Sequence, residues 1–119
     1  KINNANLKNV IANSQLEKFV SSLPEGLNTS IGERGLKISG GEKQRIGIAR
    51  SLFSNKKILI LDEATNALDK VTEDLILKFL KNEKNNKTII MISHEKNTLK
   101  FCDRLYEFKG GILENYVKQ

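Results

Sequence analysis

Two unbroken apolar runs, at residues 58–61 and 89–92, limit the folds open to this chain. They read Ile-Leu-Ile-Leu and Ile-Ile-Met-Ile, without the alternation of apolar and polar residues that a half-exposed strand shows. Strands of this kind are typical of parallel sheets whose two faces are both covered. We therefore expect two buried parallel strands, and the apolar spacing from Val71 to Leu80 predicts a helix between them.

Helical patterns precede the first of these strands. Apolar residues recur at helical spacing over residues 4–23, with a break near Ser14 and a proline closing the pattern. Residues 24–37 carry three glycines and no sustained period, so an ordered loop is expected there. A second amphipathic helix is expected over residues 39–53.

The last part of the chain predicts a short helix and a hairpin. The helix is expected over residues 95–101, and residues 105–108 and 112–114 predict two strands joined by a Lys-Gly-Gly turn. The whole order of elements is typical of a doubly wound α/β fold with a mostly parallel sheet, preceded by a helical piece.

The composition fits a soluble globular domain. Apolar residues make up 39% of the 119 residues and charged residues 29%, and a chain of this length forms one domain at most. The longest apolar stretches have four or five residues, far fewer than the roughly 20 that cross a bilayer, so no membrane-spanning or signal segment is expected. The chain starts with Lys1 inside a polar helical pattern, and we expect this end to be a truncation.

Charge and cysteine content argue against nucleic-acid binding and against a disulfide-stabilised fold. The net charge is +6, but the lysines are scattered without interleaved aromatic residues, so solvated helix faces explain them better than nucleic-acid binding does. The single cysteine, Cys102, cannot form an internal disulfide, which fits an intracellular location. Its expected role is that of a small buried hydrophobe, and a reactive thiol is the alternative.

The run Ser39-Gly40-Gly41-Glu42 lies where a loop becomes a helix, and it allows two interpretations. One is a capping box, in which the Ser39 hydroxyl accepts from the Glu42 amide and the Glu42 carboxylate accepts from the Ser39 amide. The other is an anion site, because a helix N-terminus offers unpaired N–H groups and two glycines let a phosphate approach the backbone.

Two carboxylates, Asp62 and Glu63, follow the first apolar run directly. Doubly wound sheets bind their ligands at the carboxyl ends of the strands, and carboxylates there suit Mg²⁺, which takes oxygen ligands and keeps several waters. The alternative is a buried strand that ends in acidic residues as it reaches solvent.

Asp69 and His94 are two further polar candidates. Asp69 precedes the predicted helix that begins near Val71 and can serve as its N-cap. His94 is the only histidine and follows the second apolar run after Ser93. A lone histidine is more often a packed or surface residue than a catalytic one, so the residue type alone does not decide its role.

The order of these motifs resembles that of a known family. Residues 32–45 read Gly-Glu-Arg-Gly-Leu-Lys-Ile-Ser-Gly-Gly-Glu-Lys-Gln-Arg and resemble the signature motif of ATP-binding cassette (ABC) transporters with its exporter-type preceding loop. Residues 58–63 resemble the Walker B motif with its catalytic glutamate, residues 66–69 the D-loop, and His94 the switch histidine. Ile38, Glu42 and Asn66 depart from the family's usual Leu, Gln and Ser.

The resemblance implies a partial P-loop NTPase domain and a composite ATP site. Residues 1–56 would be the helical subdomain with the signature, and residues 57–119 the Walker B, D-loop and switch-histidine part of the core. The implied γ-phosphate site acts on an ATP held by a second nucleotide-binding domain paired head to tail, and its residues are Ser39, Gly40, Gly41 and Glu42, with Asp69 in the D-loop.

The resemblance also implies roles for the carboxylates and the histidine. Asp62 would hold Mg²⁺ through water, Glu63 would orient and polarise the attacking water, and His94 would contact the γ-phosphate. Glu33, Arg34 and Gly35 would face the transmembrane domains of the transporter, which places the domain at the cytoplasmic face of a membrane.

One expected motif is missing from the sequence. No Gly-x-x-x-x-Gly-Lys-Ser/Thr run occurs, so the phosphate-binding loop and its strand are expected to be absent and the chain alone to be inactive. Two alternatives to an exporter ATPase therefore remain open. One is a truncated, non-hydrolysing cassette that supplies its signature in trans, and the other is a soluble ABC ATPase that acts on ribosomes or DNA.

Overall fold

The computed structural model describes residues 3–32 and 34–116. It begins with the helices α1 (Asn4–Asn13) and α2 (Glu17–Ser22) and a 3-10 turn, η1 (Gly26–Asn28), before helix α3 (Gly40–Phe53). The break near Ser14 that the apolar spacing predicted is therefore confirmed. At this break Gln15 adopts a left-handed backbone conformation, with φ 56°, and the Arg45 side chain donates to its carbonyl.

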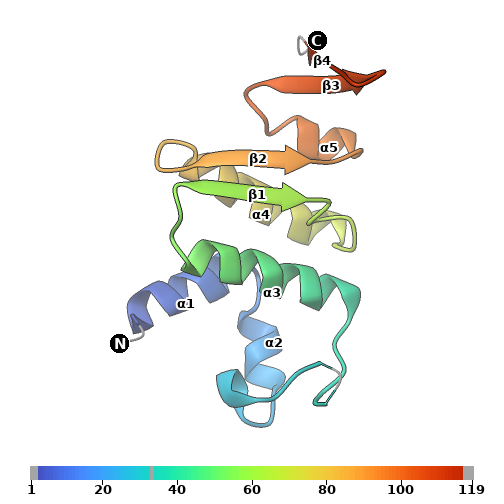
Figure 1. Cartoon of the computed structure of the whole chain (residues 1–119). Coiled ribbons are helices and arrows are strands. Elements are labelled where there is room, and N and C mark those ends of the chain that lie inside the picture. Colours follow the sequence, from blue (N-terminus) through green and yellow to red (C-terminus); the bar gives the residue numbers. More distant parts are fainter. Residues whose placement is uncertain (1–2, 33, 117–119) are drawn as a thin grey trace.

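The strand–helix–strand unit follows as strand β1 (Ile58–Asp62), helix α4 (Lys70–Glu83) and strand β2 (Thr88–Ile92). The two strands are parallel and in register, with Ile58 opposite Thr88 and Asp62 opposite Ile92. Their carboxyl ends therefore meet at one edge, and α4 lies behind the pair (Figure 1). This arrangement is the α/β unit that the apolar runs predicted.

The chain ends in a short helix and a hairpin. Helix α5 (Lys96–Leu99) is followed by the antiparallel strands β3 (Leu105–Lys109) and β4 (Ile112–Tyr116). Among the described residues the hairpin forms its own two-stranded sheet, separate from β1 and β2 (Figure 1). Half of the described strand pairing is thus antiparallel, although the strands' order along the chain is the expected one.

The main core lies on one side of the parallel strands. Its buried side chains come from both α-helical and β-strand segments: Val10, Ile48, Leu52, Leu59, Leu61, Ile76 and Leu80. Helices α1, α3 and α4 therefore pack against a single face of β1. Burying these apolar side chains supplies most of the free energy that holds the helical piece to the sheet.

The expectation that β1 is buried on both faces is wrong for this structure. Leu59 and Leu61 are 5% and 4% exposed, whereas Ile58 and Ile60 are 60% and 62% exposed. Ile90 and Ile92 on β2 extend the same exposed face, at 47% and 49%. An apolar run shows that a strand can be buried on both faces. Burial also requires other segments to cover each face, and the described residues cover only the face that carries Leu59 and Leu61.

Candidate functional site

The N-terminus of α3 is capped by its own side chains. Ser39 Oγ accepts from the Glu42 amide at 3.2 Å, and Glu42 Oε2 accepts from the Ser39 amide at 2.7 Å, so both halves of the capping box are present. Among the described residues, no hydrogen bond occupies the amides of Gly40 and Gly41. The capping box and an anion site are therefore compatible, since they use different N–H groups.

Gly41 has a structural reason to lack a side chain. A Cβ at this position would lie 3.0 Å from the Ala67 carbonyl oxygen, which is tighter than ordinary van der Waals contact. At Gly40 a Cβ would meet only the Ala67 methyl group, at 3.5 Å. The first turn of α3 thus packs against the loop that follows Glu63, within the same chain.

The loop after β1 begins with a strained turn. Asp62 is the last residue of the strand and is exposed, and Glu63 has a left-handed backbone with φ 46°. This conformation is uncommon for a residue other than glycine and is often found at functional sites. The Glu63 amide donates to the Ile92 carbonyl at 2.9 Å, which ties the turn to the end of β2.

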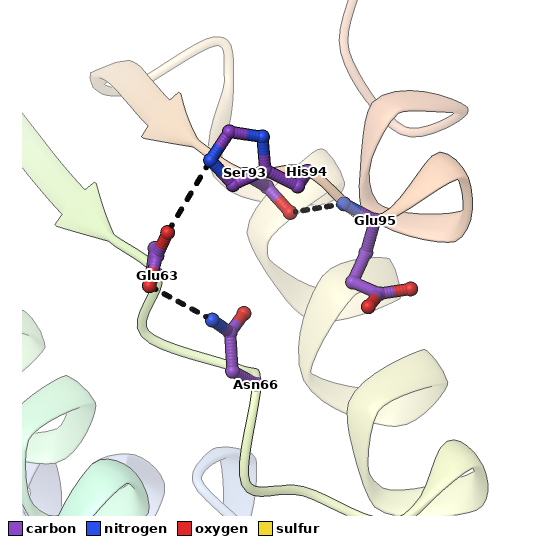
Figure 2. A network of polar contacts seen from close by, with 5 residues as sticks. All are labelled: Glu63, Asn66, Ser93, His94 and Glu95. Atoms are coloured by element: carbon purple, nitrogen blue, oxygen red, sulfur yellow. Dashed lines mark hydrogen bonds and ion pairs between the residues drawn. The ribbon is translucent and has the colours of Figure 1, made fainter.

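Glu63 and His94 lie side by side at this edge of the sheet. His94 Nε2 is 3.5 Å from Glu63 Oε1, and Asn66 Nδ2 donates to Glu63 Oε2 at 3.1 Å (Figure 2). The His94 side chain is 91% exposed and that of Glu63 is 47% exposed. Both side chains are therefore open to a ligand approaching the carboxyl ends of the strands.

The turn that carries His94 is held by its neighbours. Ser93 Oγ accepts from the Glu95 amide at 3.0 Å, across the histidine (Figure 2). Such a short side-chain turn fixes the backbone while leaving the side chain between the two residues free to point outward. The lone histidine is thus presented by an ordered backbone, on the surface rather than in the core.

Gln44 connects helix α3 to the loop after β1. Its Nε2 donates to the Glu63 carbonyl at 3.0 Å, and its Oε1 accepts from the Ala67 amide at 2.8 Å. The sequence resemblance includes Gln44, but the motif alone gave it no role. From the sequence, a polar residue one turn into a helix is expected to face solvent. The partners of Gln44 lie 19 and 23 residues away in the sequence, so no local pattern reveals them.

Asp69 is the N-cap of α4, as its position predicted. Its Oδ2 accepts from the Thr72 amide at 3.0 Å. The side-chain hydrogen bond to Thr72 is the largest cause that lowers the pKa of Asp69, because it favours the ionised carboxylate. Asp69 is therefore held charged at the end of the loop that starts at Glu63.

The carboxylates fit Mg²⁺ only as a water-rich site. Asp62 and Glu63 are adjacent and exposed, and within residues 3–32 and 34–116 no cluster of three or more His, Cys, Asp or Glu side chains could enclose a metal ion. Mg²⁺ commonly binds through one or two carboxylates, with waters and substrate phosphates as its other ligands. Asp62 could hold such an ion from the edge of the sheet.

The loop before the signature is partly described. Glu33 lies outside the described residues, Arg34 is exposed, and Gly35 makes a close backbone turn. A Cβ at Gly35 would lie 2.2 Å from the Ser30 carbonyl oxygen, so the turn requires glycine. The Leu36 amide donates to this same carbonyl at 2.9 Å.

Comparison with known proteins agrees with this arrangement of motifs. The family model described as "ABC transporter" matches residues 2–66. Multidrug resistance protein 1 of Entamoeba histolytica is 45% identical over 97 residues, which are 81% of this chain and 8% of that protein. The uncharacterized ABC transporter ATP-binding protein YwjA of Bacillus subtilis is 48% identical over 95 residues, 80% of this chain and 16% of that protein.

A solved structure shares the fold as well as the sequence. The structure of a bacterial Atm1-family ABC exporter with ATP bound has a TM-score of 0.83 and 40% identity, and the match covers 92% of this chain and 19% of that one. The α/β fold and the motif order define part of an ABC ATP-binding domain. The chain belongs to the ABC transporter family and is homologous to its exporters.

The chain spans less than a fifth of the length of the relatives and of the solved exporter compared above. None of the helices in the described part of the chain has the length and apolar character needed to cross a bilayer.

Proposed function

We propose that this chain forms the signature, Walker B and switch-histidine part of an ATP-hydrolysing domain that powers export of a substrate across a membrane. The observation that carries the proposal is the Glu63–His94 pair, 3.5 Å apart at the carboxyl ends of β1 and β2. Family membership supports ATP as the substrate of this site. In this proposal residues 1–56 act as the helical subdomain and residues 57–119 as part of the catalytic core.

Glu63 is the proposed general base. Its carboxylate is half exposed, and one oxygen accepts from Asn66 while the other faces His94, so its direction is restrained at both oxygens. A carboxylate in this position orients and polarises the water that attacks the γ-phosphate. His94 contacts the same phosphoryl group from the neighbouring strand, and because the site positions groups rather than forming covalent bonds with ATP, small displacements are costly.

Asp62 is the proposed ligand of Mg²⁺. When bound, the ion neutralises charge that develops on the phosphate oxygens. Asp62 and Glu63 are neighbours in the chain, but the left-handed turn at Glu63 separates the directions of the two residues. The two carboxylates can therefore serve different partners, one the metal ion and the other the attacking water.

Ser39, Gly40, Gly41 and Glu42 are proposed to act on a different ATP, held by a second nucleotide-binding domain. The capping box satisfies the amides of Ser39 and Glu42 without a ligand, and the amides of Gly40 and Gly41 are left for the γ-phosphate. Asp69 completes the same face through the D-loop, which touches Gly41 at Ala67. The proposed partners are therefore a second domain, in a head-to-tail dimer, and the transmembrane domains, with no role for nucleic acid.

The loop at Arg34 and Gly35 is proposed to face those transmembrane domains. Arg34 is exposed, and the close turn at Gly35 leads directly into the signature helix through Leu36 and Ser39. A change at the γ-phosphate can thus reach this loop through a short stretch of backbone. This arrangement would place the domain at the cytoplasmic face of the membrane.

The test is Glu63→Gln in the intact transporter that contains this chain. The amide keeps the shape of the side chain and loses the charge, so ATP binding should persist while turnover falls by about 100-fold to 10,000-fold. Lys78→Gln, a change at an exposed position on the far part of α4, is the matched control and should leave turnover unchanged. Turnover within twofold of the unmodified protein in Glu63→Gln would remove Glu63 from the catalytic role.

The same preparation distinguishes the alternatives. An exporter ATPase should show turnover that depends on Mg²⁺ and changes with a transported compound in membranes. A non-hydrolysing cassette would show ATP binding without turnover in every variant. A soluble ABC ATPase would show turnover that responds to ribosomes or DNA and not to membranes.

A further inference from the structure

Glu73 is a buried carboxylate that the proposed mechanism does not use. It lies in the first turn of α4, behind the loop that begins at Glu63, and is only 7% exposed. A buried carboxylate is unfavourable unless hydrogen bonds compensate for its lost hydration. Its position in the first turn helps, because the N-terminus of a helix carries partial positive charge.

The hydrogen-bond partners of Glu73 come from two segments, the loop after β1 and helix α5. Thr65 and Thr98 each donate a hydroxyl hydrogen bond to Oε1 at 3.0 Å, and Asn97 Nδ2 donates to Oε2 at 3.3 Å. The two threonines are 4% and 1% exposed, so these bonds lie in the interior. One oxygen atom of Glu73 is thus shared between a threonine before α4 and a threonine in α5.

Each of these threonines follows a site residue at short range. Thr65 is two residues after Glu63, and Thr98 is four residues after His94. Within the described ranges, residues 64–69 and residues 95–99 share no direct hydrogen bond, and Glu73 is the group that joins them. The geometry around one carboxylate oxygen therefore contributes to the spacing between the loop after β1 and helix α5.

We propose that Glu73 is a positioning residue that holds Glu63 and His94 within reach of each other through Thr65 and Thr98. The inference rests on the proposed function, since it assumes that Glu63 and His94 act on the same phosphoryl group. At the surface the Glu63 carboxylate is held by Asn66 and faces His94, whereas the His94 side chain is 91% exposed. The interior hydrogen bonds at Glu73 restrain the backbone segments that carry Glu63 and His94.

The chemistry explains why an acid occupies this position. An ionised carboxylate only accepts, so both threonine hydroxyls and the Asn97 amide must point toward it. A glutamine would present an NH₂ group on one side and would lose one of these bonds or reverse its direction. Hydrogen bonds to a charged acceptor are also stronger than those between neutral groups, which favours a fixed spacing.

The test compares Thr98→Val with Thr98→Ser in the intact transporter. Valine keeps the shape and removes the hydroxyl, so kcat for ATP should fall about tenfold while KM changes less than twofold, and serine should restore kcat to within about twofold. Asp74→Asn is the control, because Asp74 also accepts from Asn97, whereas the hydroxyl groups of Thr65 and Thr98 donate to Glu73. It should leave kcat unchanged.

A double-mutant cycle with His94→Ala separates positioning from general loss of structure. If Thr98 acts through His94, then adding Thr98→Val to His94→Ala should lower kcat by less than about twofold. The same tenfold loss in both backgrounds, or an unchanged kcat in Thr98→Val alone, would overturn the proposal. If the Thr98→Val protein does not accumulate, Thr65→Val and Thr65→Ser test the same link from the loop after β1. Thr65→Val should then lower kcat about tenfold in the unmodified protein and by less than about twofold when added to Glu63→Gln, and Thr65→Ser should restore kcat to within about twofold.

Failure of this proposal can be distinguished from failure of the proposed function. Loss of turnover in Glu63→Gln alone supports the proposed ATPase. If that loss is seen and Thr98→Val has no effect, only the role of Glu73 is wrong. If Glu63→Gln turns over ATP normally, the proposed function fails, whatever the threonine variants do.

Discussion

The N-terminus of α3 and the Glu63–His94 pair differ in how much of their geometry the chain supplies by itself. The helix N-terminus is capped by two reciprocal hydrogen bonds, from the Glu42 amide to Ser39 Oγ at 3.2 Å and from the Ser39 amide to Glu42 Oε2 at 2.7 Å. Glu63 and His94 are 3.5 Å apart and are 47% and 91% exposed, on two segments that the pairing of β1 and β2 brings together. The geometry of a helix N-terminus can be set by local sequence, whereas the geometry of the proposed catalytic pair depends on contacts between segments far apart in the chain.

Gln44 links the two regions, and its removal should have the largest effect of the stability variants. Gln44→Leu loses the bonds to the Glu63 carbonyl and the Ala67 amide, so the free energy of unfolding should fall by about 1 to 2 kcal/mol. Gln44→Glu is the matched variant, because it keeps an acceptor for Ala67 and loses only the donor. In urea unfolding, Gln44→Leu should therefore lower the free energy of unfolding more than Gln44→Glu does. Equal stability of Gln44→Leu and the unmodified chain would mean that the two regions are not joined by this side chain.

Ser39→Ala tests the region that is set locally. The variant removes the hydroxyl that accepts from the Glu42 amide, so the free energy of unfolding should fall by about 1 kcal/mol. Ser39→Thr should retain most of the stability, since threonine also caps helices. Thermal unfolding measures both. An unchanged midpoint in Ser39→Ala would indicate that the terminus does not need its own cap, and the contrast between the two regions would weaken.

Of these variants, Asp69→Asn should change the free energy of unfolding least, and the change should depend on pH. Hydrogen bonds to Thr72 hold the pKa of Asp69 below its usual range in the folded chain. The stabilisation from this group is therefore fully present above roughly pH 4 and is lost as the pH falls through the lowered folded value. Asparagine also caps helices but does not titrate, so this part of the acid dependence should disappear. Urea midpoints measured from neutral to acidic pH in both proteins check the prediction, and an identical acid dependence in the two would contradict it.

The elements that the sequence predicted well are those set by neighbouring residues. The capping box at Ser39 and the N-cap at Asp69 each involve residues three positions apart, and the structure confirms both. The strands β1 and β2 follow from their apolar runs. The family resemblance gave Glu63 and His94 roles at one γ-phosphate, but the direct contact between them comes from the structure, because the pairing of β1 and β2 makes their segments neighbours.

The elements that the sequence missed depend on distant contacts. Glu73 meets Thr98 across 25 residues, and in the sequence it looks like one more charged residue on a helix surface. The exposed face of β1 at Ile58 and Ile60 was missed for a related reason. An apolar side chain is buried only where another segment covers the face of the strand that carries it.

The central claim is that the two regions serve different ATP molecules, the signature in trans and the Glu63–His94 pair in its own domain. Gly40→Asp is the suitable probe, since a Cβ there makes only ordinary contact with the Ala67 methyl group, whereas one at Gly41 would press on the Ala67 carbonyl. The added carboxylate should repel a γ-phosphate and leave the fold in place.

The direct measurement is single-turnover ATP hydrolysis by mixed dimers of the intact transporter that combine Gly40→Asp with a disabled phosphate-loop lysine. With the two lesions on different domains, both fall on one composite site and the other site stays whole, so hydrolysis at one site per dimer should persist. With both lesions on one domain, each composite site carries one lesion and hydrolysis should be lost. More activity when both lesions share a domain would show that residues 39–41 serve their own domain. Equal activity in the two arrangements would also contradict the account, because the trans arrangement requires a difference.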